Sequence, residues 1–145
     1  MWAYSVSMFD QCLYFNTTAL ARRLEREWAD AFRPFALTPP QAFLLRAVLA
    51  RPGLCPGELA DILAIARPTA TRALDGLTVK GLVERRPSAR DGREATVFAT
   101  DEAARIGSAL NAAAGAVTAR LKSVLGEDAF AGAVAHVRRV RGALG

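Results

Sequence analysis

The segment that most constrains the fold of this 145-residue chain lies at residues 67–93, where a short helix pattern leads directly into two strand-like runs. Apolar residues recur at helical spacing through residues 67–80, and Gly81 stands where helices often end in a left-handed residue. Residues 82–86 and 94–99 then flank a turn-forming loop that contains Pro, Ser, Asp and Gly. The pattern predicts a helix that is followed at once by a β-hairpin.

The same segment carries most of the excess positive charge. It contains seven Arg or Lys residues and three Asp or Glu residues, a local net charge of +4, whereas the whole chain carries +5. Phosphates attract such a surface whatever their base sequence, and a helix that projects beside it can contact base edges. The segment therefore predicts contact with double-stranded DNA.

Three helices are expected before this segment. Apolar residues at helical spacing predict a long helix over residues 10–33. Thr38–Gln41 is a strong helix start, because it combines a Thr cap, two prolines and a Gln three residues after the cap. That helix ends at residues 51–53, and a short third helix begins at Pro56. The second helix is expected to turn four residues inward: Phe43, Leu44, Ala47 and Val48.

Two helices are expected after the hairpin, one capped by Thr100 and broken at Gly126, and a last one from Glu127. The order of elements predicts a mainly α fold with a small β-hairpin wing, that is, a winged helix-turn-helix core between terminal helices. The single domain, residues 1–145, then divides into the core at about residues 38–100 and the terminal helices at about residues 10–36 and 101–145.

The residues from Pro56 to Ala103 resemble the DNA-binding core of the MarR family of bacterial transcriptional regulators, and the likeness extends almost end to end. It rests on Glu58-Leu59-Ala60, Thr69–Leu74, Lys80–Arg85, Asp91-Gly92-Arg93 and Thr100 at the start of the next helix. The resemblance implies a homodimer in which the terminal helices of the two chains interlock and two winged helices face one DNA site. Apolar terminal helices with little core of their own agree with this, and an intramolecular bundle is the alternative.

In a winged helix-turn-helix of this kind, the surface expected to contact DNA bases is the face of the 67–80 helix opposite Ala70, Leu74 and Leu77. Arg72 can reach the O6 and N7 atoms of guanine bidentately, and Arg67 at the helix start suits a phosphate. The alternative is a solvated helix face. The expected DNA contacts are Arg67, Pro68, Thr69, Thr71, Arg72, Arg85, Arg86, Ser88, Arg90 and Arg93.

The tip of the wing is expected at Arg90, Asp91 and Arg93. The family resemblance implies that the Asp-x-Arg element steadies the wing and that a basic side chain enters the minor groove, where negative potential is concentrated. Asp91 is interpreted as the partner that holds an Arg in place, since phosphates would repel its own charge. An ordinary charged turn is the alternative.

Cys12 and His136 are the remaining candidates for chemistry. Some MarR relatives sense peroxides through a Cys on the first helix, but Cys12 falls about two residues short of that position and has no evident basic neighbour to lower its pKa. We expect a buried structural cysteine, with a redox switch as the alternative. His136 and two widely separated Cys residues give no metal-ligand spacing, so His136 is expected at a helix surface or interface. No catalytic set or Gly-rich phosphate loop stands out, and we expect neither an enzyme nor a cofactor or metal.

The resemblance also implies a small aromatic or anionic effector that binds between the terminal helices and the winged helix. Trp28, Phe32, Phe43 and Arg46 are candidates to line such a cleft, although core packing explains the aromatic residues equally well, and no ligand is assigned. No apolar run approaches the roughly 18–20 residues that span a bilayer, and the N-terminus lacks the features of a signal peptide. A cytoplasmic protein is expected.

The sequence therefore predicts a homodimeric DNA-binding regulator, a repressor that binds a palindromic operator and is released by a small molecule. Two alternatives stay open: a winged helix that serves as a protein-interaction module, and a redox-sensing regulator that acts through Cys12.

Overall fold

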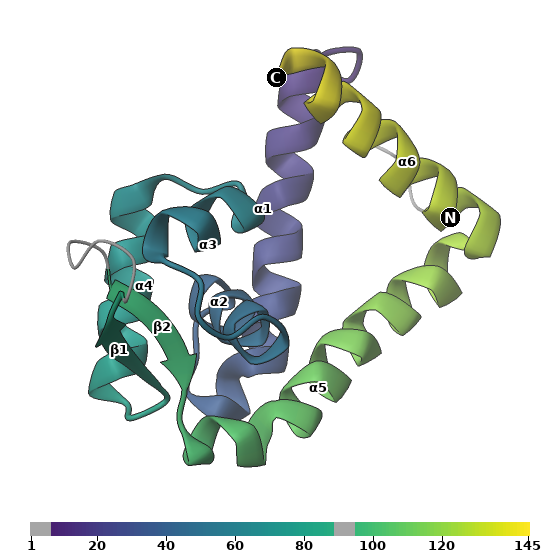
Figure 1. Cartoon of the computed structure of the whole chain (residues 1–145). Helices are drawn as coiled ribbons and strands as arrows, with labels where there is room; N and C mark the ends of the chain where they lie inside the picture. The colour runs from purple at the N-terminus through teal and green to yellow at the C-terminus, as the bar shows by residue number, and fades with distance from the viewer. Residues whose placement is uncertain (1–6, 89–94) are drawn as a thin grey trace.

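The computed structural model describes residues 7–88 and 95–145, and within these it has the expected mainly α architecture with one antiparallel hairpin (Figure 1). The elements are α1 Leu13–Phe32, the 3-10 turn η1 Arg33–Phe35, α2 Pro39–Ala50, α3 Pro56–Leu63, α4 Arg67–Val79, β1 Val83–Pro87, β2 Ala95–Ala99, α5 Asp101–Leu125 and α6 Glu127–Leu144. The predicted fold class, a winged helix-turn-helix core with helices at both ends, is confirmed.

The start of α2 is fixed by the predicted capping box. The Thr38 hydroxyl accepts a hydrogen bond from the Gln41 backbone N–H at 3.4 Å, and the Gln41 side-chain oxygen accepts one from the Thr38 N–H at 3.1 Å. Two amides that the helix itself leaves without partners are thereby satisfied. The capping box therefore fixes the residue at which α2 begins, after α1 and the η1 turn.

The junction between α4 and β1 is a Schellman turn, which moves the start of the strand by one residue. Gly81 has a φ of +72°, its N–H donates to Thr78 at 3.0 Å, and the Leu82 N–H donates to Leu77 at 3.0 Å. Because the Leu82 amide closes the helix, the strand begins at Val83 and not at Leu82 as expected. Helix α4 and the hairpin are therefore joined by a tight turn.

The hairpin packs one face against the helices. Val83 pairs with Ala99 and Arg85 pairs with Val97, and the buried Val83 and Val97 mark this as the inner face. Val97 also forms an isolated bridge with Leu54, in the segment before α3. The hairpin is thereby attached to both α4 and the segment before α3.

The buried core gathers residues of α2, α3, α4, β2 and α5 around Leu44, Leu45, Leu59, Leu74 and Leu77. The expectation for α2 was partly wrong. Leu44 and Val48 are buried as expected, but so are Ala42 and Leu45, whereas Phe43 and Ala47 are half-buried. Helix α2 contacts α4, α5 and β2 as well as α1, so its buried positions do not follow a single stripe.

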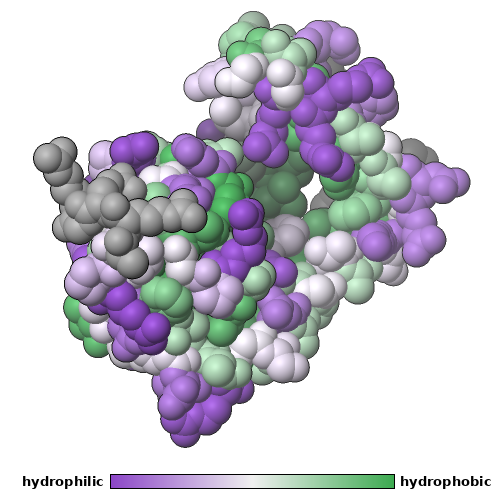
Figure 2. All heavy atoms as spheres, viewed as in Figure 1, coloured by the Kyte–Doolittle hydropathy of each residue, from purple (hydrophilic) through white to green (hydrophobic). Residues whose placement is uncertain are grey.

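The terminal helices extend beyond this core. Helix α5 runs away from it and α6 turns back from the far end of α5, and the space-filling view shows a hollow between the core and this arm (Figures 1 and 2). On α1 only Phe32, at the core end, is buried, and no residue of α6 is. Among the described residues, no helix combines the length and apolar character needed to cross a membrane.

Candidate nucleic-acid interface

Helix α4 presents a polar face opposite its buried stripe. Ala70, Ala73, Leu74 and Leu77 are buried, which fixes the rotation of the helix on the core. The expected contact residues divide accordingly. Arg67, Pro68, Thr71 and Arg72 are exposed, whereas Thr69 is half-buried at the edge of the face.

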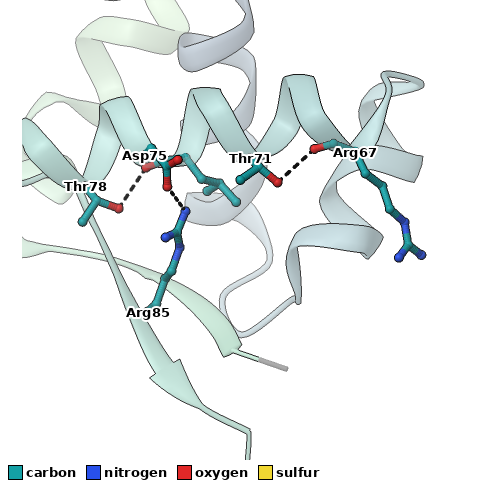
Figure 3. Close-up of polar contacts among 6 residues, drawn as sticks. Arg67, Thr71, Asp75, Thr78 and Arg85 are labelled. Atoms are coloured by element: carbon teal, nitrogen blue, oxygen red, sulfur yellow. Dashed lines mark hydrogen bonds and ion pairs between the residues drawn. The ribbon is translucent and has the colours of Figure 1, made fainter. Parts of the chain in front are cut away.

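Two residues of this face already have partners within the chain. The Thr71 hydroxyl donates to the Arg67 carbonyl at 3.0 Å, as Figure 3 shows, so its proton is used inside the helix and its lone pairs remain outward. The Arg67 side chain lies against the start of α3, where a Cβ on Gly57 would come within 3.1 Å of the guanidinium. Arg67 therefore projects from the point where α3 and α4 meet.

Arg85 and Arg86, both expected to contact phosphates, point to opposite faces of β1. Arg85 lies on the inner face and donates to Asp75 of α4 at 2.7 Å (Figure 3). Arg86 lies on the outer face, where it pairs with Glu84 at 2.5 Å and stacks over Phe98 at 4.1 Å from the ring centroid. Each arginine thus has a carboxylate partner before any DNA is present.

Sequence reasoning missed the pairing of Asp75 with Arg85. The alternation of the strand contained a signal for it. Val83 and Arg85 share one face of β1, and an apolar residue at position 83 indicates that this face points toward the core and hence toward α4.

The remaining wing residues lie at or beyond the limit of the described chain. Ser88 is half-buried just past the end of β1. Arg90, Asp91 and Arg93 lie outside the described residues, so the expected steadying role of Asp91 remains a prediction.

A cavity of about 450 Å³ lies between α1, α2 and α5, at the place expected for an effector. Trp28, Phe43 and Arg46 line it as anticipated, together with Asn111 and Lys122 of α5. The expectation for Phe32 was wrong, because its ring is fully buried and meets the Phe43 ring edge-on at 6.0 Å in the core. Asn111 and Lys122 were missed because only the packing of α5 across α1 and α2 brings them there.

The polar groups of this cavity are arranged around the Phe43 ring. Arg46 donates from Nε to the Asn111 side-chain oxygen at 2.7 Å, and its guanidinium lies 5.1 Å from the centroid of the Phe43 ring. The Trp28 Nε1 atom is buried and has no hydrogen-bond partner among the described residues. A second cavity, of about 440 Å³ and mainly apolar, lies on the other side of Trp28 against Leu24 and Leu63.

The expectation that Cys12 is a buried structural residue was wrong. It is exposed at the N-cap of α1, because the first turns of this helix pack against little in their own chain. His136 lies exposed on α6, in agreement with a helix-surface position. The described residues contain no group of three or more His, Cys, Asp or Glu side chains that could hold a metal ion.

A family model described as the MarR family matches residues 37–94, the segment from just after η1 to just before β2. No curated protein matches the chain in sequence. The reduced form of MarR from E. coli is 26% identical with a TM-score of 0.72, and the match covers 88% of this chain and 95% of that one.

Two further structures match over a larger part of the chain. A mutant MarR from E. coli complexed with operator DNA is 24% identical with a TM-score of 0.81, covering 93% of this chain and 99% of that one. The transcriptional repressor CouR bound to a 23-mer DNA duplex is 24% identical with a TM-score of 0.84, covering 94% and 99% of the two chains. The chain therefore shares its central segment with the MarR family model and its full architecture with these regulators.

Proposed function

We propose that this protein is a homodimeric, sequence-specific DNA-binding repressor that binds a palindromic operator and is released by a small anionic effector. The observation that carries the proposal is the exposed face of α4, where Pro68, Thr71 and Arg72 project opposite a fully buried stripe. A helix held in this way can enter a major groove without rearrangement of its core.

DNA as the partner is supported by the chemistry of this face and by the relatives. Arg72 reads guanine and Arg67 binds phosphate oxygens, whereas the outward lone pairs of Thr71 accept from a base amino group. The wing residues Arg90 and Arg93 extend the contact into the neighbouring minor groove. Two of the similar structures, an E. coli MarR mutant and CouR, were solved on DNA.

The homodimer is supported by apolar surface on the terminal helices. Leu13 and Leu20 of α1 are 64% and 52% exposed, and Val137 of α6 is 49% exposed, in one chain alone. Apolar surface gathered in this way on helices that bury little in their own chain is typical of an interface. A second copy of the chain would cover it.

The effector site is supported by the chemistry of the cavity between α1, α2 and α5. The Phe43 and Trp28 rings provide walls for an aromatic ligand, and the Arg46 and Lys122 side chains provide positive charge. An aromatic carboxylate fits these groups.

Binding to the DNA upstream of the protein's own gene, measured by fluorescence anisotropy across a salt series, tests the proposal. The logarithm of the affinity should fall linearly and steeply with the logarithm of the salt concentration, because several phosphate contacts release counterions. An absence of binding to any genomic fragment at low salt would overturn it and favour the protein-interaction module.

The effector is tested by titrating benzoate and larger aromatic carboxylates into the operator complex. Release of the wild-type protein and resistance of an Arg46→Ala variant are expected, whereas Arg51→Ala at the exposed end of α2 should respond like the wild type. Equal release of all three proteins would show that the effector does not act through this cavity.

A further inference from the structure

We propose that Asp75 and Arg85 are positioning residues for DNA recognition, and that their ion pair holds the wing at a fixed angle to the recognition helix. The inference rests on the proposed DNA binding and deepens it. It changes the role of Arg85, which sequence reasoning assigned to a phosphate.

The pair joins the two elements that are to meet DNA. Asp75 lies on the exposed face of α4, one turn after Arg72, and Arg85 lies in the middle of β1 (Figure 3). The joint between α4 and β1 is the turn at Gly81, which two backbone hydrogen bonds close at the end of the helix. The Asp75–Arg85 contact, at 2.7 Å, spans ten residues and adds a second link between helix and strand, away from this turn. It opposes bending about the turn.

The burial of Arg85 distinguishes it from the other ion-paired arginines. Its side chain is 35% exposed, less than any other arginine side chain in a salt bridge between described residues. Its strand partner Val97 is buried, so the aliphatic stem of Arg85 follows the inner face of the hairpin to reach Asp75. An arginine that is directed inward in this way is poorly placed for a phosphate outside.

The charges lead to the same conclusion. A free carboxylate at Asp75, in the centre of a DNA-reading face, would repel phosphates, and Arg85 neutralises it. If Arg85 left to bind a phosphate, it would expose this carboxylate next to the duplex. Keeping the pair intact therefore favours binding, and DNA that excludes water from the interface strengthens the attraction between its members.

Substitution of Asp75 distinguishes a positioning role from a phosphate contact of Arg85, because the two roles predict opposite changes in operator affinity. If the pair positions the wing, Asp75→Asn should lower operator affinity by about three- to tenfold, and Arg85→Gln should do the same. The double variant should be no weaker than the weaker single variant, because both changes break one interaction. Affinity for random DNA should not fall for Asp75→Asn, since that change only removes a negative charge, so the ratio of operator to random binding drops.

The competing role predicts the opposite result. If Arg85 contacts a phosphate, Asp75→Asn frees Arg85 and raises affinity for operator and random DNA alike. In that case Arg85→Gln alone lowers affinity and reduces the salt slope by about one phosphate contact. Either tighter binding by Asp75→Asn or a reduced salt slope for Arg85→Gln would overturn the proposal.

Glu102 and Arg105 provide the matched control. They also form an arginine–carboxylate pair, at 3.4 Å, but both belong to α5, so the pair links no second element. Glu102→Gln with Arg105→Gln should leave the ratio of operator to random binding unchanged, and Arg85→Lys, which keeps the charge, should lower this ratio less than Arg85→Gln does. A wild-type protein that binds no DNA would defeat the proposed function itself, whereas wild-type binding with an unchanged ratio in Asp75→Asn would defeat only this inference.

Discussion

The Gln41 side chain contacts the start of α2, the end of α4 and the middle of α4. Its oxygen accepts hydrogen bonds from the Thr38 N–H at 3.1 Å and from the Lys80 ammonium at 3.3 Å, and Lys80 also donates to the Ala36 carbonyl. Its side-chain nitrogen occupies the position that a Cβ on Gly76 would need. The start of α2 and the end of α4 are therefore fixed to each other, and α4 requires glycine where the two helices meet.

Gly76→Ala should lower the free energy of unfolding by about 1–2 kcal/mol, as an overpacked core does, even though alanine favours a helix. The Gln41 amide would have to move and lose its bonds to Thr38 and Lys80. In a Gln41→Ala background the same substitution should instead stabilise by about 0.5–1 kcal/mol. Gly115→Ala on α5, where a Cβ meets nothing within 4 Å, is the control and should also stabilise. Urea unfolding measures all four, and stabilisation by Gly76→Ala alone would contradict the argument.

Arg72→Ala should weaken operator binding by about 1–3 kcal/mol and relax the preference at one base pair in each half-site. The reason is the loss of a bidentate contact to guanine, which a phosphate contact would not provide. Arg105→Ala near the start of α5 removes the same charge away from α4 and should have little effect. Equal losses on operator and random DNA, measured by competition binding, would show that Arg72 binds phosphate.

At the scale of whole elements, the helices of the core differ in the hydrogen bonds that cap their first turns. Helix α2 has the complete capping box, and the Thr100 hydroxyl accepts from the Ala103 N–H at 3.3 Å at the start of α5. The N-cap of helix α4 is Ala66, which has the extended backbone of a cap but no side chain that could accept a hydrogen bond. The recognition helix is therefore held by its buried stripe and its C-terminal turn more than by its start.

Ala66→Ser should raise the free energy of unfolding by about 0.5–1.5 kcal/mol, because the new hydroxyl can accept from a free amide in the first turn. Thr38→Ala, which removes an existing cap, should lower it by a similar amount. Thermal and urea unfolding of the two variants give the comparison. No gain from Ala66→Ser would mean that the first turn of α4 is already satisfied by other means.

At the scale of the whole molecule, the terminal helices expose apolar residues that the core does not cover. Leu24 would be a poor position for testing a dimer interface, since it is half-buried and lines the apolar cavity beside Leu63 of the core. Leu20 and Val137 are free of such contacts with the core and stand about half exposed on α1 and α6. They test assembly without disturbing the winged helix.

The double variant Leu20→Glu/Val137→Glu should be a folded monomer with much weaker operator binding, because charges placed in an apolar interface lose their hydration. Val79→Glu introduces the same charge at an exposed position of α4 and should stay dimeric. Sedimentation velocity and circular dichroism measure assembly and folding. A wild-type protein that is monomeric at micromolar concentration would refute the dimer.

A symmetric dimer also constrains its operator. Two recognition helices related by a two-fold axis reach one face of the duplex when the half-sites lie about 10 bp apart, centre to centre. We expect an imperfect palindrome of roughly 16–20 bp, which holds two such half-sites and their flanks. Footprinting measures it, and equally tight binding to an isolated half-site would contradict this spacing.

The sequence alone determined the order of the elements and most of their boundaries. Local rules were sufficient there: the Thr38–Gln41 box, the Gly81 turn and the break at Gly126 each depend on residues within a few positions of one another. The buried stripe of α4 followed from helical spacing, and with it the exposure of Arg72.

Only the tertiary structure decided which distant side chains meet. The Asp75–Arg85 pair depends on the angle between α4 and β1, and the contact of Arg46 with Asn111 spans 65 residues. The exposure of Cys12 depends on how far α1 extends past its packing partners. Local propensity cannot fix these features, because each arises from the way that separate elements pack on a shared core.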